Sequence, residues 1–361
     1  MLHLRPSASH RWSKCAAFPR WAEAIPPKPD SDPAREGTAA AWVAELVLRG
    51  DASSTSDMVG KTHKNGWFIT EEMAADVQDY VDLILSRNGE IRAEQEVTFM
   101  RTDTVTVSGT LDSSVLSIKG GRLNVDDLKY GRRVVEVYQN PQLVIYAAAL
   151  VMSLPANTVN LVQLGIYQPR AFHRDGIYRK WVVSVDELYQ YAELYWNAAL
   201  QCASPEPSAS PGRWCGDCPV AAKCVALAQT TYAMCDTIQS RHQRDMTSKE
   251  LARELDFFDE VDAIISARRD AVFAEAEGRA KIENIPGWQM TQRMGKSRFT
   301  VDGPMIHLLT GIDPYEKKVV TPAELKRRGA PPEVVKQITT TPVIGHKLAK
   351  ANIDNVFNKG E

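Results

Sequence analysis

The amino-acid sequence predicts an α/β fold whose core runs helix, three strands, helix, strand. Residues 71–86 carry apolar side chains at spacings of three and four, as one face of a helix does. Three runs of alternating, β-branched residues follow between residues 93 and 128. An apolar helical segment then covers residues 140–152, and a further strand pattern covers residues 158–168. We therefore expect a mixed sheet flanked by helices.

The N-terminal part is expected to hold two helices after an irregular arm. Residues 1–35 are rich in proline, serine and arginine, which favours loop structure. Residues 36–49 (EGTAAAWVAELVLR) have helical periodicity with an alanine-rich start, and a polar connection follows over residues 50–70. The apolar face of the next helix, residues 71–86, consists of Met73, Val77, Tyr80, Val81 and Ile84.

The central strands are expected to be consecutive along the chain. Lys-Gly-Gly at residues 119–121 is a favourable tight turn between two of them. The strands are predicted at residues 93–100, at 104–111 with a continuation through 115–118, and at 122–128. After the strand at residues 158–168, a further strand is predicted at 180–184 and a helix at 185–202.

The character of the chain changes after Cys235, which predicts two domains, residues 1–235 and 236–361. The second is expected to be a mainly helical extension. Its predicted elements are a long charged helix at residues 248–281, a short β-hairpin at 288–300 and a basic helical tail at 321–350.

Composition places few limits on the function. The 361 residues include 44% hydrophobic and 24% charged residues, as in ordinary globular proteins, and the net charge is -2. This balance argues against a histone-like binder but allows a local basic groove for DNA. No run approaches a membrane span, and residues 1–14 lack the apolar centre of a signal peptide. A cytoplasmic location, with reduced thiols, is therefore expected.

Four cysteines have the spacing of a metal site. Cys215, Cys218 and Cys224 form a C-x2-C-x5-C pattern, and Cys15 lies two hundred residues upstream. Four thiolates suit a 4Fe–4S cluster or a zinc ion, and spacing alone does not separate the two. Cys202 and Cys235 fall outside the pattern and are expected to be free thiols. A centre of this kind would join the two ends of a domain.

Two aspartates and a lysine form the second candidate site. Asp112 ends one predicted strand, Asp127 lies near the end of the next, and Lys129 shares the sheet face of Asp127. Carboxylates on adjacent strands can share a hard cation such as Mg²⁺. Glu96 on the preceding strand could supply a third ligand; Glu94 shares its face, so spacing does not choose between them.

With Gln142 and Tyr146 on the following helix, this order of residues resembles the PD-(D/E)XK nuclease superfamily. The likeness is to the RecB-like branch with a four-cysteine iron–sulfur cluster, to which the AddB nuclease domain and CRISPR-associated RecB-like exonucleases belong. It covers about residues 10–235. The N-terminal run from Pro6 to Trp12 also resembles the start of an uncharacterised phage and prophage group.

The resemblance implies a restriction-endonuclease-like fold and a Mg²⁺- or Mn²⁺-dependent DNA exonuclease of the phage recombination type. It favours iron over zinc and suggests a phage single-strand annealing protein as a partner. Asp112, Asp127 and Glu96 would bind metal and Lys129 would position water. Gln142 and Tyr146 would support the site, and the cations Arg132 and Arg133 would hold DNA.

One position departs from the pattern of the resembled family. Many of its members carry Gly-x-x-x-His on the first helix, with the histidine on a metal; here Ala41 stands in that place. The site could hold one metal only, or Glu36 or Glu45 could substitute, or activity could be reduced. In the last case the protein would be a DNA-binding scaffold. Both glutamates could equally be ordinary charges on the helix surface.

Overall fold

The computed structural model describes residues 1–26, 29–216, 218–239, 247–294, 298–315, 321–322, 325, 330–340 and 343–350. The chain divides into two compact units, Met1–Arg268 and Arg269–Glu361. The division falls within the long helix α8 (Ser248–Arg279). The boundary expected after residue 235 lies earlier, in α7 (Val225–Gln239).

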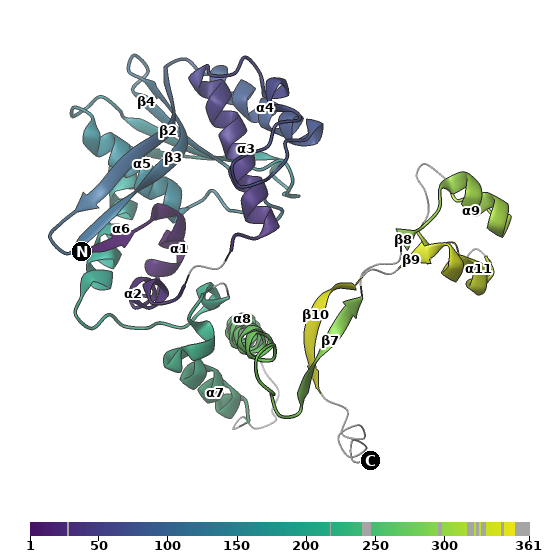
Figure 1. The fold of residues 1–361 in the computed structure, drawn as a ribbon. Helices are drawn as coiled ribbons and strands as arrows, with labels where there is room; N and C mark the ends of the chain where they lie inside the picture. Colours follow the sequence, from purple (N-terminus) through teal and green to yellow (C-terminus); the bar gives the residue numbers. More distant parts are fainter. Residues whose placement is uncertain are drawn as a thin grey trace. The chain divides into compact units, whose positions relative to one another are not determined.

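A six-stranded mixed sheet forms the centre of the first unit (Figure 1). Its main path joins β1, β3, β4, β5 and β6 in that order, and β2 pairs with β3. The β1–β3 and β4–β5 pairs are parallel and the others antiparallel. The strands are β1 (Leu2–Leu4), β2 (Glu90–Arg101), β3 (Val105–Ser117), β4 (Arg122–Leu128), β5 (Leu161–Tyr167) and β6 (Tyr178–Ser184). The predicted α/β class with a mixed sheet is confirmed.

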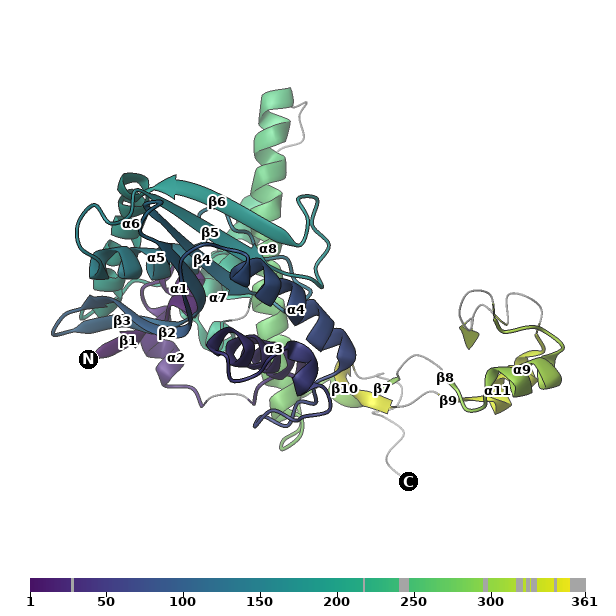
Figure 2. The same ribbon diagram turned by 90° about the horizontal axis from the view of Figure 1, so that it is seen from above.

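Helices cover both faces of this sheet (Figure 2). One core joins the helices α5 (Pro141–Ser153) and α6 (Val185–Ala203) to apolar strand residues such as Val125. The other core joins α3 (Asp32–Arg49) and α4 (Glu71–Leu85) to the opposite face. Because α5 packs against β2, β4 and β5, its polar first turn is held above the ends of the central strands.

Local sequence explains where these helices begin and end. Asn140 caps α5 by accepting hydrogen bonds from the backbone N–H groups of Gln142 and Leu143. The helix α3 begins at Asp32, ahead of the expected residue 36, because proline in the first helical turn lacks only an N–H that would be unpaired anyway. It ends at Gly50, whose φ of 82° suits glycine.

The expectation of an irregular arm over residues 1–35 was wrong. β1 adds to β3, and the 3-10 helix η1 (Pro6–Ala8) and the helices α1 (Ser9–Trp12) and α2 (Phe18–Glu23) follow. Trp12 is 1% exposed and its indole N–H donates to the Arg5 carbonyl at 2.9 Å. These short elements depend on contacts with distant parts of the chain, which local composition does not reveal.

Shorter elements complete the first unit. The 3-10 helix η2 (Thr55–Met58) precedes α4. Two further 3-10 helices, η3 (Arg213–Cys215) and η4 (Ala221–Lys223), carry the chain through the cysteine-rich segment into α7. In the part of the chain that the structure describes, no helix has the length and apolar character needed to cross a bilayer.

The second unit corrects two expectations. β7 (Trp288–Met294) pairs with β10 (Val343–Lys350), and β8 (Arg298–Phe299) pairs with β9 (Thr339–Thr340). The described strands β7 and β8 therefore do not form a hairpin with each other. The strands β9 and β10 replace the end of the predicted helical tail. The described helices of this region include α9 (Gly303–Thr310) and α11 (Pro332–Gln337). Of the predicted segments, residues 295–297, 323–324, 326–329 and 341–342 lie outside the described residues.

Candidate active site and cysteine cluster

Asp127, Lys129 and Gln142 form a closed ring of contacts. The Lys129 ammonium lies 2.7 Å from Oδ2 of Asp127 and donates a hydrogen bond to Oε1 of Gln142 at 3.2 Å. The Gln142 amide donates in turn to Oδ1 of Asp127 at 3.0 Å. β4 supplies the aspartate, the residues after it supply the lysine, and the first turn of α5 supplies the glutamine. The three side chains thus hold one another in place.

Asp112 lies beside this ring on β3. Its Oδ2 accepts a hydrogen bond from the backbone N–H of Leu128 at 2.8 Å, which ties it to the end of β4. Burial of the carboxyl and the neighbouring Asp127 charge raise the pKa of Asp112 to about 8, against the opposing effect of Lys129. A cation beside these two neighbouring carboxylates would be stabilised by both of their charges.

The charges around the ring also act on Lys129 and Tyr146. Burial disfavours the charged form of Lys129, but the Asp127 and Asp112 carboxylates outweigh it and raise the pKa of the ammonium. Burial and the same two carboxylates raise the pKa of the Tyr146 hydroxyl, opposed by its hydrogen bond with Gln142. Lys129 therefore remains a cation and Tyr146 a neutral hydroxyl over the physiological range.

Of the two candidate glutamates on β2, Glu94 is the one near the aspartates. The register pairs Ala93 with Ser113 and Gln95 with Leu111, which leaves Glu94 opposite Asp112. Burial raises the pKa of Glu94, and Glu45 and Asp127 add to this effect while Arg49 opposes it.

Glu96, the preferred candidate, lies elsewhere on the same strand. It stands opposite Thr110 and is exposed. The backbone of Glu94 has a φ of 47°, a conformation that residues other than glycine rarely adopt. Strain of this kind occurs where the surrounding structure enforces it, often at functional sites.

The two candidate glutamates on α3 have different surroundings. Glu45 pairs with Arg49 at 2.6 Å, and Arg49 also donates to the Glu94 carbonyl at 3.3 Å, so Glu45 belongs to the cluster around Glu94. Glu36 instead pairs with Arg170 at 2.7 Å, and that guanidinium lies 4.6 Å above the Tyr130 ring. Ala41 is half-buried on the same helix. A methyl group cannot ligate a metal.

Arg132 and Arg133 lie in an exposed loop between β4 and α5. The buried Gln168 fixes the backbone of this loop, because its amide donates to the carbonyls of Gly131 and Arg133, both at 2.8 Å. The side-chain oxygen of Gln168 accepts from Val135 at 3.1 Å. The two cations therefore project from a loop that is held next to Lys129.

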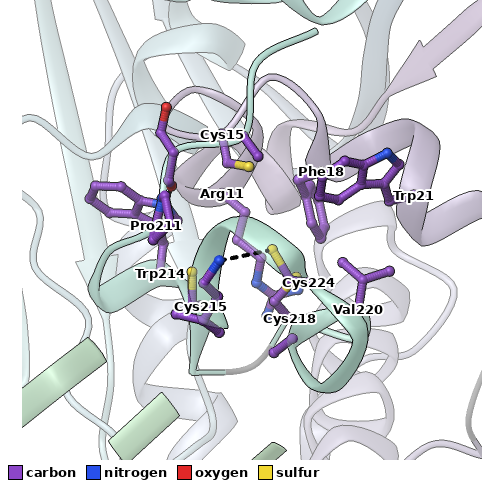
Figure 3. A pocket seen from close by; sticks show the side chains of 14 residues that line it. Arg11, Cys15, Phe18, Trp21, Pro211, Trp214, Cys215, Cys218, Val220 and Cys224 are labelled. Carbon is purple, nitrogen blue, oxygen red and sulfur yellow. Dashed lines mark hydrogen bonds between the residues drawn. The ribbon is translucent and has the colours of Figure 1, made fainter. Parts of the chain in front are cut away.

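The four predicted cysteines line one pocket. Figure 3 shows the sulfurs of Cys15, Cys215, Cys218 and Cys224 directed into the same space, with Arg11 beside them. Cys15 comes from the N-terminal segment and the other three come from the segment containing η3 and η4. Apolar side chains close the pocket; among them are Phe18, Trp21, Val220 and Leu227.

The thiols of this pocket influence one another. Burial raises the pKa of Cys215 to about 11, and the other three cysteines contribute to the shift. Burial also raises the pKa of Cys218, while Arg11 opposes this by favouring the thiolate. The fifth described cysteine, Cys202, is fully buried and donates to the Trp12 carbonyl at 3.4 Å. It does not line the pocket.

The oxygen and sulfur donors of these two sites differ in the groups they could hold. Among the described residues, no group of three or more histidine, cysteine, aspartate or glutamate side chains has the geometry of a metal site as it stands. The residues present are nevertheless of suitable kinds. Oδ2 of Asp127 is buried and accepts no hydrogen bond, although Lys129 is close. Carboxylate oxygens suit Mg²⁺ or Mn²⁺, and four thiols beside an arginine suit an iron–sulfur cluster or zinc.

One protein family matches nearly the whole chain. The family described as "Protein of unknown function (DUF2800)" matches residues 3–350. The chain belongs to this family. No curated protein matches it.

Several solved structures resemble this DUF2800 member weakly. "Crystal structure of SSO0001" is 14% identical, with 63% of this chain and 87% of that chain covered and a TM-score of 0.30. The phage related exonuclease from Haemophilus somnus 129PT is 11% identical, with 56% and 93% covered and a TM-score of 0.24. The alkaline exonuclease (LHK-Exo) from Laribacter hongkongensis is 8% identical, with 46% and 88% covered and a TM-score of 0.22. Likenesses at this level do not bear on activity.

Sequence reasoning missed the contacts of Arg49 in this DUF2800 member and preferred Glu96 to Glu94. Arg49 stands one turn after Glu45 on α3, a spacing that predicts a salt bridge and was available from the sequence. The choice of Glu94 over Glu96 had no such signal, because both lie at alternate positions on one strand. It depends on the pairing register and on the unusual backbone of Glu94.

Proposed function

We propose that this DUF2800 protein is a metal-dependent deoxyribonuclease, and in particular a DNA exonuclease of the phage recombination type. The observation that carries the proposal is the contact of the Lys129 ammonium with both Asp127 and Gln142 beside Asp112. A cation, two carboxylates and an amide in one partly buried cluster are the groups that phosphodiester hydrolysis uses.

In this proposal each side chain has a defined task. Lys129 orients the attacking water and balances the negative charge that develops on the phosphate. Gln142 holds both Lys129 and Asp127, because its amide accepts from one and donates to the other. Tyr146, whose hydroxyl keeps its proton, supports the same cluster. Water attacks phosphorus and the bond to the leaving oxygen breaks. The attacking water gives up a proton to solvent and the leaving oxygen takes one up, so one product ends in a phosphate and the other in a hydroxyl.

Asp112, Asp127 and Glu94 would hold the Mg²⁺ or Mn²⁺ ion, with Glu45 next to them. When bound, the ion would neutralise charge on the phosphate and lower the pKa of the attacking water. Glu96, which the sequence favoured for this task, is exposed on the same strand. The choice of Glu94 rests on the strand register, which sets it opposite Asp112.

Cys15, Cys215, Cys218 and Cys224 would hold a 4Fe–4S cluster that joins the N-terminal segment to the segment after α6. Four cysteine thiolates leave such a cluster with net negative charge. The guanidinium of Arg11, which favours the thiolate of Cys218, would offset part of that charge. The cluster would serve the stability of the fold, since the catalytic groups are a separate set of oxygen and nitrogen atoms.

The direct test is cleavage of linear duplex and single-stranded DNA by the purified chain, with and without Mg²⁺ or Mn²⁺. Lys129→Ala should lower the rate by roughly 10²- to 10³-fold, as loss of one donor that stabilises transition-state charge does. Lys180→Ala is the matched control, because Lys180 is an exposed lysine on β6. Equal rates for Lys129→Ala and the unaltered chain would refute the proposal.

A DNA-binding scaffold is the second candidate function, favoured by one observation. Ala41 places a methyl group on α3 where a histidine ligand would stand, so the cation site depends on acidic side chains only. Tight DNA binding with no cleavage in Mn²⁺ would favour the scaffold over the nuclease. In either case a single-strand annealing protein of phage type is the proposed partner, and co-purification of the two proteins would test it.

A further inference from the structure

An open cavity of about 590 Å³ adjoins the catalytic ring. Lys129 and Gln142 line it directly, so the cavity opens onto the candidate active site. Its other walls come from the N-terminal segment around η1 and α1, from the loop before α5, and from η3. Its volume is that of a site for a small ligand, and it is too small to enclose a duplex.

The walls of the cavity carry cations. Arg133 lines it from the loop that Gln168 holds in place, and Arg11 lines it from α1. Arg213 also lines it, although Asp259 and Glu260 of α8 pair with that guanidinium at 3.3 and 3.2 Å. Glu136 is the carboxylate in the lining, and it contacts His173 at 3.4 Å. Cations thus outnumber carboxylates along the walls, which favours a phosphate-bearing ligand.

Two aromatic side chains complete the lining, Tyr138 and Trp214. Tyr138 is 62% exposed, yet its ring packs edge-on against Trp181 with centroids 5.1 Å apart. Gln139 donates hydrogen bonds to the hydroxyls of Tyr138 at 3.2 Å and Tyr191 at 3.0 Å. The Trp214 indole N–H donates to the Ser210 carbonyl at 2.7 Å. Both rings are therefore held in fixed orientations beside the cavity.

The backbone at the cavity wall is also unusual. Gln139, which orients Tyr138, has a φ of 52°. Three described residues other than glycine have positive φ; one is Glu94 in the catalytic cluster and another is Gln139 here. Holding a glutamine in this conformation costs free energy. With Gln139 in this conformation, the Tyr138 ring lies at the edge of the cavity.

Resting on the proposed nuclease function, we propose that this cavity binds the unpaired end of a DNA strand and feeds it to Lys129. Tyr138 and Trp214 stack on unpaired bases, and Arg133 holds the backbone phosphate. Base faces inside a duplex are covered by neighbouring bases, so rings that stack on successive bases favour a strand that has separated. The inference selects single-stranded DNA, or a frayed duplex end, as the substrate of the site.

The test measures binding of a fluorescein-labelled oligothymidylate to the full chain, purified anaerobically and without added Mg²⁺ or Mn²⁺. Tyr138→Ala should weaken binding roughly 5- to 150-fold, the range found for loss of one base-stacking ring. Tyr138→Phe keeps the ring and should bind like the unaltered chain. Tyr232→Ala is the matched control: Tyr232 is 66% exposed on α7 and outside the cavity lining.

Two further measurements separate stacking from loss of structure. An oligonucleotide with 5-iodouracil should crosslink on irradiation to Tyr138 or Trp214, and a crosslink mapped elsewhere would overturn the proposal. For Arg133→Ala, the slope of log affinity against log salt concentration should fall by about 0.7, the value for one phosphate on a single strand. An unchanged slope would remove Arg133 from the proposal.

The outcomes also distinguish this inference from the nuclease proposal. If Tyr138→Ala binds and cleaves single-stranded DNA like the unaltered chain, while Lys129→Ala is inactive, the cavity is not the strand path but the nuclease proposal stands. If the unaltered chain neither binds nor cleaves DNA with any metal, both fall. If Tyr138→Ala binds single-stranded DNA more weakly but cleaves intact duplex as fast as the unaltered chain, only the assignment of single-stranded DNA as substrate falls.

Discussion

Asp126 and Asp127 are neighbours in sequence and lie on opposite faces of β4. Asp127 contacts Lys129 and Gln142 on the α5 side. Asp126 is fully buried and pairs with Arg87 after α4, whose Nη2 donates to Oδ1 of Asp126 at 2.9 Å. The Tyr178 hydroxyl donates to the same Asp126 oxygen at 3.0 Å. Alternation along one strand thus separates a structural carboxylate from the candidate catalytic one.

This separation predicts different effects for two substitutions. Arg87→Met should lower the free energy of unfolding by about 3–5 kcal/mol, because it leaves the buried Asp126 charge without its partner. Lys129→Met should change stability less, since Lys129 lines the open cavity and its side chain is 29% exposed, against 11% for Arg87. Urea denaturation followed by circular dichroism measures both. A larger loss for Lys129→Met than for Arg87→Met would contradict the separation.

The glutamate pair on β2 offers an internal comparison. Glu94→Gln should lower nuclease activity by more than the roughly 10- to 100-fold typical of an outer-shell partner of a metal. Glu96→Gln should leave activity near that of the unaltered chain, because Glu96 is exposed and stands opposite Thr110. Rates at saturating Mg²⁺ and the Mg²⁺ concentration for half-maximal rate are the measurements. The opposite ranking would restore Glu96 as the third carboxylate.

The raised pKa of Asp112 predicts a pH-dependent stability. Between the ordinary value of 3.8 and the folded value of about 8, the folded chain keeps a proton that the unfolded chain has lost. The free energy of unfolding should therefore fall as pH rises through this window, by the contribution of this one group. Asp112→Asn should remove that contribution. Thermal melting of both proteins across the window, without metal, tests the sign.

A cation should act on the same group. Mg²⁺ or Mn²⁺ stabilises the ionised form of Asp112, so it should raise the melting temperature more at the alkaline end of the window than at the acid end. Asp112→Asn should reduce this difference. A metal-induced shift that is equal at both ends, or larger in acid, would argue that the ion binds elsewhere.

Gly109 on β3 is predicted to be required for close packing. A Cβ at this position would lie 2.9 Å from Cδ of Pro6 and 3.3 Å from the Tyr146 hydroxyl. Gly109→Ala should therefore cost about 1–3 kcal/mol by overpacking. Gly37→Ala is the matched control, because a Cβ there meets nothing within 4 Å and alanine in a helix gains about 0.5–1 kcal/mol over glycine. Equal effects in urea denaturation would refute the packing argument.

The cysteine pocket predicts that removing one of its four thiols would cost the protein both its bound metal and part of its stability. Cys15→Ala should abolish the visible absorbance of anaerobically purified protein and lower its melting temperature. Cys202→Ala should keep the bound metal, because Cys202 donates to the Trp12 carbonyl and does not line the pocket. Metal analysis decides between iron and zinc. A Cys15→Ala protein that keeps its colour and its melting temperature would exclude the cluster.

The sequence by itself determined the elements with strong periodicity or clear ends. The helix α4 and the strand β4 lie where the apolar patterns predicted them. Alternation also placed Asp127 and Lys129 on one face, which their 2.7 Å contact confirms. The C-x2-C-x5-C spacing and the distant Cys15 predicted the residues that share a pocket. The two elements, the shared face and the short cysteine spacing depend on local backbone geometry, which a sequence states directly. That Cys15 joins the other three cysteines depends on the tertiary fold.

Only the tertiary structure decided the rest, because long-range pairing overrides local composition. β1 exists because β3 offers a free edge to residues 2–4, and β7 pairs with a strand about fifty residues later. Register across β2 and β3 brought Glu94, and not Glu96, opposite Asp112. The cavity that Tyr138 and Trp214 share comes from segments far apart in the chain. No spacing in the sequence records which distant segments will meet.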